Sequence, residues 1–270
     1  MLLYKPMSDK QATGRRLGRR LRISKSRQTI IDLMHLSMSF PLIAIERTMD
    51  FSELASARRD HPRRPSWSAL FAKGFALAAE EFAVLRQAYF GFPFAYMYEY
   101  EDSTVNIGHE LAVGGEASVL PVRVRSPNRM SLDDIRSKII EMADADLWQR
   151  GFYRTLSAVG LLPFFLRRPI WWFVLNVPRF RRRAFGTAVV SSIGALGAEI
   201  LTPRAPVTSF LTYGALDCNG SVRVRLVFDH RVYDGATAAR ILGRLEELMR
   251  GPLYNEIASQ PSAAAVSGAG

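Results

Sequence analysis

One histidine of this chain stands where a strand is expected to pass into a helix. His230 lies in the run Asp229-His230-Arg231-Val232-Tyr233-Asp234-Gly235-Ala236, between an alternating segment, 221–229, and a helix predicted from about Gly235 to Arg250. Such a junction holds a side chain rigidly at the edge of a sheet, as a general base requires. A lone histidine that merely ends a strand is the commoner case, so His230 alone leaves both roles open.

The spacing His-x-x-x-Asp-Gly from His230 to Gly235, with the same flanking residues, resembles the signature of a known family. That family is the catalytic domain of the dihydrolipoyl acyltransferase component of 2-oxoacid dehydrogenase complexes, and more distantly chloramphenicol acetyltransferase. Residues 186–194, Gly-Thr-Ala-Val-Val-Ser-Ser-Ile-Gly, are similar to its Gly-Thr-Phe-Thr-Ile-Ser-Asn-Leu-Gly and lie upstream of the histidine, as in the family. Residues 26–30 are a weaker match to Met-Arg-Lys-x-Ile, and the resemblance extends from about residue 23 to 256.

The resemblance implies a role for four residues. His230 would be the general base and Ser191 the donor to the oxyanion of a tetrahedral intermediate, both of which thioester exchange requires. Asp234 would support the turn before the last helix, and Arg27 would be its ion-pair partner. Without the resemblance, Ser191 is a strand-end hydroxyl, Asp234 a helix cap and Arg27 one more cation of a basic arm.

The same resemblance implies a homotrimer, with the histidine and the serine on opposite walls of a channel between neighbouring subunits. It also implies an α+β fold, a chloramphenicol acetyltransferase-like mixed β-sheet sandwich with flanking helices. The apolar patterns agree with this mixture, because they do not alternate as regular βαβ units do. Helices are predicted at 27–35, 51–59, 68–88, 132–147 and 235–250, and strands at 42–49, within 94–126, and at 188–191, 207–216 and 221–230. Ser66 is the expected N-cap of the third helix, the capping pattern from Ser131 to Asp134 begins the fourth, and Gly251-Pro252 ends the fifth.

Three regions are predicted along the chain. Residues 1–22 form a flexible basic arm, 23–256 the acyltransferase domain, and 257–270 a disordered tail. The lipoyl and subunit-binding domains of the complex-forming proteins do not fit into the first 22 residues, so no bound lipoyl group is expected. A separate carrier must then bring the acyl group, and a coenzyme A thioester is the simplest donor. The acceptor, a thiol, hydroxyl or amine, stays unidentified.

The segment from about 148 to 185 is an apparent insertion relative to the family. Eight arginines and no acidic residue occur between Gln149 and Ala198. Its two apolar runs, 156–166 and 170–177, are separated by Arg167-Arg168-Pro169, and neither is long enough to span a bilayer. Aromatic residues flanked by arginines suit peripheral contact with an anionic membrane. Packing over the acceptor channel or against a neighbouring subunit is the alternative, and the favoured one.

The formal charge of +11 favours anionic partners. Nucleic acid is disfavoured, because the sequence has no zinc-finger spacing, helix-turn-helix signal or ribonucleoprotein motif. Cys218 is the single cysteine and His35, His61 and His109 lack ligand spacing, so neither an internal disulfide nor a metal is predicted. The N-terminus lacks a secretory signal, and no apolar run is long enough to span a membrane. We therefore expect a cytoplasmic protein, with a peripheral position at the membrane as the alternative.

Two functions therefore compete. The first is an acyltransferase that moves an acyl group from acyl-CoA or another thioester. The second is a catalytically silent trimeric scaffold, or a protein that binds acyl carriers. The set of His230, Asp234, Gly235 and Ser191 favours the first, since a scaffold has no chemical need for it.

Overall fold

The computed structural model describes residues 21, 23–113, 116–142 and 158–259. Within them, one six-stranded sheet has the order β1-β8-β7-β6-β4-β5, and β2 pairs with β3 in a separate two-stranded sheet. The strands are β1 (Leu42–Asp50), β2 (Gln87–Phe90), β3 (Tyr96–Glu99), β4 (Thr104–Val113), β5 (Glu116–Arg125), β6 (Ala188–Ser191), β7 (Ser209–Tyr213) and β8 (Ser221–Asp229).

The large sheet is mixed. Strand β6 pairs in parallel with β4 and with β7, whereas the pairs β1–β8, β7–β8 and β4–β5 are antiparallel. A sheet of this kind together with many helices confirms the predicted α+β class.

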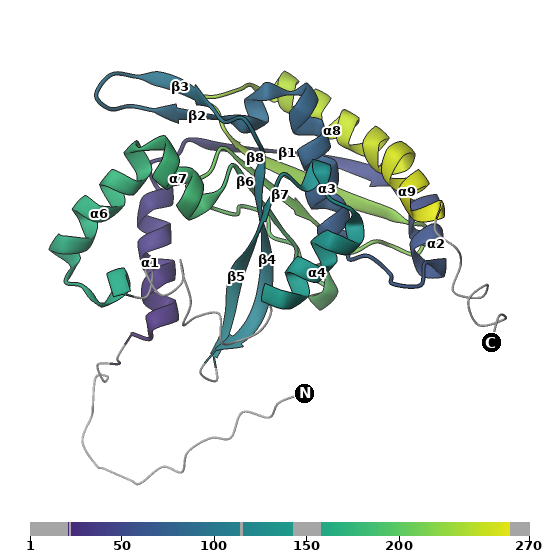
Figure 1. Ribbon diagram of the computed structural model, residues 1–270, viewed down its shortest axis with the longest axis horizontal. Coiled ribbons are helices and arrows are strands. Elements are labelled where there is room, and N and C mark those ends of the chain that lie inside the picture. The colour runs from purple at the N-terminus through teal and green to yellow at the C-terminus, as the bar shows by residue number, and fades with distance from the viewer. Residues whose placement is uncertain (1–20, 22, 114–115, 143–157, 260–270) are drawn as a thin grey trace, which may run out of the picture.

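Helices lie on one face of the sheet and at one of its ends (Figure 1). Helices α3 and α8 pack on the sheet, whereas α1, α6 and α7 gather at the left of Figure 1, near the β2–β3 hairpin. The helices are α1 (Lys25–Ser37), α2 (Ser52–Asp60), α3 (Trp67–Glu81), α4 (Leu132–Met142), α6 (Phe164–Asn176), α7 (Pro178–Phe185), α8 (Gly235–Leu248) and α9 (Tyr254–Ala258). Short 3₁₀ turns occupy Ala83–Arg86, Pro127–Arg129 and Gly194–Leu196.

The core lies between the sheet and α3 and α8. Successive side chains of a strand point to opposite faces. On β8, Val224, Leu226 and Phe228 are buried against the helices, whereas Arg223 and Arg225 point to the other face. The alternation of the sequence in this strand thus sets which face meets the helices.

The third predicted helix, 68–88, is shorter than expected. The prediction ran to Ala88, but α3 ends at Glu81, because Phe82 leaves the helical region at φ −109° and ψ 89°. The Arg86 side chain then donates to Ala79 O (2.9 Å) and to Tyr100 O (2.7 Å), which ties the end of α3 to the start of the hairpin. Residues 87–90 therefore become β2 instead of a last helical turn.

The C-terminal helix does not stop at Gly251-Pro252 as predicted. Helix α8 ends at Leu248, a π-helical segment (Met249–Leu253) passes through both residues, and α9 follows to Ala258. The buried side chains of Leu253 and Ile257 hold this extension on the core. The described chain thus continues in a helix beyond the expected end at residue 256, while residues 1–20 and 260–270 of the predicted arm and tail lie outside the described residues.

The residues that separate the two apolar runs of the insertion lie inside one helix. Helix α6 runs through Arg167, Arg168 and Pro169. Arg167 donates to both carboxylate oxygens of Asp32 on α1 at 2.9 Å, and Trp171 Nε1 donates to the same carboxylate at 3.3 Å. Both partners of this ion pair are buried, so the contact fixes α6 against α1.

Candidate functional site: two ends of one sheet

His230 lies on a tight turn between β8 and α8. Its backbone N–H donates to Pro41 O at 3.1 Å, and Val232 N donates to Asp229 O at 2.9 Å. The imidazole is exposed, with the ring of Phe228 at 5.8 Å between centroids. The turn therefore fixes the backbone on both sides of His230 while its side chain remains open to a substrate.

An ion pair that the sequence argument missed braces this turn. Asp229 is fully buried and accepts from Arg231 three times, from the backbone N (3.0 Å), Nε (2.9 Å) and Nη2 (2.7 Å). The Arg231 guanidinium lies over the rings of Tyr89 (4.5 Å) and Phe40 (5.2 Å). These cation–π contacts hold the arginine against the loop before β1 and against β2. The two residues on either side of His230 are thus locked.

A second arginine reaches the same place from the insertion. Arg181 of α7 lies over the ring of Phe40 at 5.0 Å and donates to Tyr89 O at 2.8 Å. Burial lowers the pKa of Arg181 to about 10, and its Nη2 has no hydrogen-bond partner among the described residues. Arg181 of the insertion therefore packs against Phe40 and Tyr89, the same two residues that Arg231 contacts beside His230.

Asp234 caps α8. Its Oδ1 accepts from Thr237 N at 2.7 Å, and the hydrogen bonds with Thr237 are the main cause that lowers its pKa, with smaller contributions from Arg240 and His230. The carboxylate is thus kept ionised, as expected for a structural role. The ion pair with Arg27 is not formed within the described chain, because the Asp234 carboxylate turns back to its own helix and the Arg27 side chain is exposed on α1.

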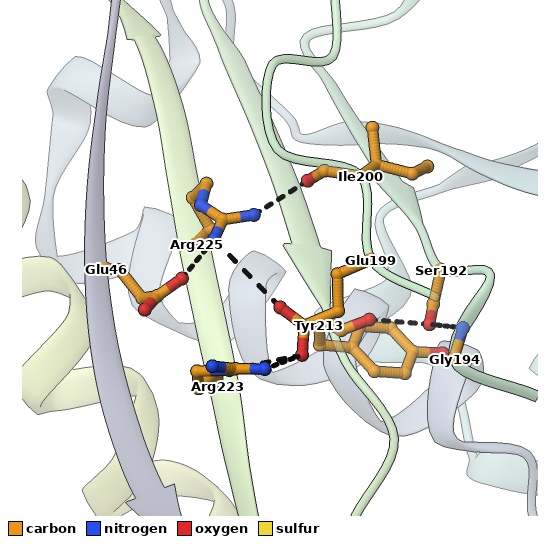
Figure 2. A network of polar contacts seen from close by, with 8 residues as sticks. All are labelled: Glu46, Ser192, Gly194, Glu199, Ile200, Tyr213, Arg223 and Arg225. Carbon is orange, nitrogen blue, oxygen red and sulfur yellow. Dashed lines mark hydrogen bonds and ion pairs between the residues drawn. The ribbon is translucent and has the colours of Figure 1, made fainter. Parts of the chain in front are cut away.

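Ser191 is the last residue of β6, and glycines fit the backbone at both ends of its motif. Gly186 adopts φ +73°, and a Cβ there would lie 2.6 Å from Thr104 O. A Cβ at Gly194 would lie 2.6 Å from Ala215 N, so only glycine lets the turn after Ser191 approach the end of β7. Ser192 tightens the same turn by donating to Tyr213 O at 2.6 Å and accepting from Gly194 N at 3.0 Å (Figure 2).

The strand register places Ser191 in a row of polar residues. Ser191 is opposite Thr212, Thr212 is opposite Arg225, and Arg225 is opposite Glu46, so the four share one face of the sheet. The side chains of Ser191 and Thr212 are buried, and neither hydroxyl makes a hydrogen bond to another described residue. No sequence motif points to Thr212, since only the pairing of β6 with β7 brings it beside Ser191.

The charged end of this row forms a network (Figure 2). Arg225 binds Glu46 and donates to Ile200 O at 2.8 Å, while Arg223 donates to Glu199 at 2.7 Å. Glu199 lies on the loop between β6 and β7, so the network ties that loop to β8 and β1. It holds the loop that follows Ser191 in place.

His230 and Ser191 do not meet within one chain. His230 follows Arg225, a member of the Ser191 row, by five positions along β8. At about 3.4 Å per residue, this separates the row from His230 by about 17 Å along the strand, far beyond the reach of a serine and a histidine side chain. One chain therefore supplies two half-sites at opposite ends of its sheet.

A pocket of about 220 Å³ lies between α1 and α6. Its wall includes Ser39, which is two residues from Pro41, the hydrogen-bond acceptor of the His230 amide. The insertion thus forms a hollow beside the His230 half-site. It is lined by Asp32, His35, Leu36, Ser39, Arg167, Arg168, Trp171, Trp172 and Leu175.

Neither a protein-family model nor a curated protein matches the sequence. Solved structures do. A probable dihydrolipoamide acetyltransferase from Listeria monocytogenes 4b F2365 matches with 18% identity and a TM-score of 0.64, over 92% of this chain and 98% of that one. Dihydrolipoamide acetyltransferase from Azotobacter vinelandii matches with 17% identity and a TM-score of 0.66, over 94% and 99%.

A third match is a truncated catalytic core of the 2-oxoacid dehydrogenase multienzyme complex from Thermoplasma acidophilum. It is 16% identical with a TM-score of 0.64, over 87% of this chain and 99% of that one. The chain therefore has the fold of these catalytic cores, as the motifs around Ser191 and His230 predicted.

Among the described residues, no helix has both the length and the apolar character needed to cross a membrane. No group of three or more His, Cys, Asp or Glu side chains in the same residues is placed to hold a metal ion.

Proposed function

We propose that this protein is an acyltransferase that moves an acyl group from a coenzyme A thioester to a thiol, hydroxyl or amine acceptor. The observation that carries the proposal is the exposed imidazole of His230 on a turn locked from both sides, in the fold of dihydrolipoamide acetyltransferase cores. The A. vinelandii structure concerns a serine, a histidine and an asparagine four residues later in the catalytic mechanism of that enzyme. Asp234 has the same spacing from His230.

In the proposed reaction, His230 removes the proton from the acceptor as the acceptor attacks the thioester carbonyl. The oxyanion of the tetrahedral intermediate accepts a hydrogen bond from Ser191, with Thr212 as a second hydroxyl beside it. Collapse of the intermediate breaks the carbon–sulfur bond, and the imidazolium returns the proton to the leaving thiolate. The products are the acylated acceptor and free coenzyme A, with no net change at the protein.

The distance between the half-sites supports an active site to which different subunits contribute. We propose a homotrimer, in which His230 of one subunit faces Ser191 of the next. A cyclic assembly of this kind repeats one interface, so each trimer would contain three equivalent composite sites. The Arg27–Asp234 ion pair, absent within one chain, is not needed for this arrangement, because the Thr237 amide already holds Asp234.

The basic charge of the molecule supports a phosphate-bearing donor such as coenzyme A. A pocket between α1 and α6 lies beside the His230 turn, and we propose that part of the acceptor occupies it.

Release of free thiol from short, medium and long acyl-CoA, with and without dihydrolipoamide, tests the reaction. We expect His230→Ala to lower turnover by about 10²–10⁴-fold and Ser191→Ala by about 10²–10³-fold. Ser56→Ala, an exposed hydroxyl on α2, is the matched control and should change neither. Native protein that binds acyl-CoA or acyl carriers without releasing thiol would favour the silent scaffold instead.

Mixed trimers test the composite site directly. Neither His230→Ala nor Ser191→Ala should be active alone, but co-expressed subunits should regain about one quarter of the native sites, since a native His230 then meets a native Ser191 at random. A monomer by light scattering, or mixed trimers with no activity, would contradict a site shared between subunits.

A further inference from the structure

The buried and exposed sides of helix α6 are the reverse of those of an ordinary surface helix. Its buried side carries Arg167 and Trp171, one turn apart, bound to Asp32 of α1. Its outward side carries Phe165, Trp172 and Phe173, which are 70%, 48% and 50% exposed. A surface helix ordinarily places its apolar stripe on the core and its charges in water. Arg167 therefore anchors the buried side of α6, and the aromatic side chains are exposed on the other side.

We call Phe165, Leu166, Trp172 and Phe173 the α6 outer face. It is continued by neighbouring aromatic side chains. Phe180 of α7 packs on Phe173 at 5.3 Å, and Phe92 of the turn between β2 and β3 packs on Trp172 at 4.8 Å. Both are themselves exposed, at 40% and 52%. The exposed rings thus form one contiguous surface built from three segments that are distant in the sequence.

Arginines border this surface, and no acidic residue of the same segment offsets them. Arg168, Arg179 and Arg183 are exposed, and Arg179 and Arg183 flank Phe180 on the exposed side of α7. Neither of these two forms an ion pair with another described residue. The segment from Gln149 to Ala198 contains no Asp or Glu. The surface is therefore apolar at its centre and carries one sign of charge at its edge.

We propose that the α6 outer face, with Phe180 and Phe92, docks on an anionic lipid bilayer as a peripheral, interfacial contact. Aromatic rings enter the boundary between head groups and acyl chains, while guanidinium groups remain at the head groups and bind lipid phosphates. The charge pattern selects this occupant over a second copy of the chain. Two copies that met through this same surface would bring their arginines together, which is unfavourable, whereas an anionic membrane complements them.

Vesicle binding is measured without turnover, so the test of this contact does not require activity. Native protein is sedimented with vesicles of phosphatidylcholine alone and of phosphatidylcholine mixed with phosphatidylglycerol, at low and high salt. We expect binding to the mixed vesicles only, weakened by salt. His230→Ala should bind as the native protein does, because it changes the proposed active site and leaves the lipid surface intact.

Two pairs of variants separate the apolar and the charged contributions. Trp172→Ser/Phe173→Ser should lower the vesicle partition coefficient at least tenfold. Leu196→Ser/Leu201→Ser, which removes even more exposed apolar side chains from the loop between β6 and β7, should leave it unchanged.

Arg179→Gln/Arg183→Gln should lower binding by roughly fivefold for each charge removed, from about 1 kcal/mol per basic residue near an anionic surface. The charge-matched control, Arg59→Gln/Lys138→Gln, changes exposed cations elsewhere and should have little effect.

Two further measurements decide between lipid and protein as the occupant. Quenching of tryptophan fluorescence by brominated lipid should occur in the native protein and decrease in Trp172→Phe. Light scattering should give the same oligomeric mass for Trp172→Ser/Phe173→Ser as for the native protein. Loss of the oligomer in this variant, or equal binding to both kinds of vesicle, would overturn the proposal.

Discussion

Removing the charge of Asp229 tests whether the brace beneath His230 serves the reaction or only the fold. The carboxylate accepts three hydrogen bonds from Arg231, at 2.7–3.0 Å, and is fully buried, whereas the Arg231 side chain is 31% exposed. Stranding a buried charge costs about 3–5 kcal/mol. Because the Arg231 guanidinium reaches water and keeps its contact with Tyr89, we expect Asp229→Asn to lower the free energy of unfolding by about 2 kcal/mol, within the range for hydrogen bonds to charged groups.

The kinetic effect should be larger than this loss of stability suggests. A shift of about 1 Å in a catalytic group costs on the order of 10²-fold in rate, and Asp229→Asn frees one side of the turn that positions His230. Thiol release from acyl-CoA, measured beside urea unfolding of the same samples, gives both quantities. We expect kcat to fall by about 10²-fold with little change in KM, since the brace positions the base and does not bind the donor.

Controls separate this effect from a general loss of stability. Asp133→Asn breaks an exposed ion pair with Arg63 and should cost less than about 1 kcal/mol, with kcat unchanged. In a double-mutant cycle, Arg231→Met added to Asp229→Asn should cost less than the two single changes together, because they share one interaction. If Asp229→Asn were destabilised but kept the native kcat, the claim that this ion pair positions His230 would be refuted.

Three further changes probe the fold and the two half-sites. Asp32→Ala should lower the free energy of unfolding by about 3–5 kcal/mol by stranding Arg167, whereas Asp32→Leu/Arg167→Met should recover most of it in urea unfolding; a double variant no better than the single would contradict this account of the α1–α6 contact. The pKa of Asp234 is lowered by the hydrogen bonds at the start of α8, so its stabilisation should be complete above the unfolded value of about 3.9 and lost as the pH falls through the lower folded value. Asp234→Ala should therefore melt below the native protein at neutral pH and match it in acid; a gap in Tm that persists at low pH would exclude this cause. Gly194→Ala places a Cβ 2.6 Å from a backbone nitrogen and should destabilise by about 1–3 kcal/mol, whereas Gly243→Ala on α8 meets nothing within 4 Å and should gain about 0.5–1 kcal/mol in urea unfolding.

Local features of this protein follow from its sequence. The pattern from Ser131 to Asp134 predicted a capped helix, and the two residues exchange hydrogen bonds at the start of α4, from Ser131 Oγ at 2.7 Å and from Asp134 N at 3.1 Å. Ser66 and Asp234 likewise accept from the helices that they were expected to cap. Such contacts span three residues, so the chemistry of neighbouring side chains determines them.

Predictions failed where a distant segment decides the outcome. The end of α3 at Glu81 is accompanied by a hydrogen bond from Arg86 to Tyr100, which follows β3, and the anchor of α6 is Asp32, more than a hundred residues earlier. Neither partner can be found by periodicity, which compares only residues within a few turns. The outward position of the α6 aromatics has the same origin, because the anchor on α1 sets which side of the helix faces water.

The candidate site divides in the same way. The sequence by itself determined the residue types, the motifs around Ser191 and His230, and the strand-to-helix junction that exposes the imidazole. Only the tertiary structure placed Thr212 beside Ser191. It also brought Arg231 and Arg181 to the ring of Phe40 and set the two motifs at opposite ends of the sheet. The physical reason is strand register, which depends on burying one face of each strand against α3 and α8 and so couples residues across the whole chain.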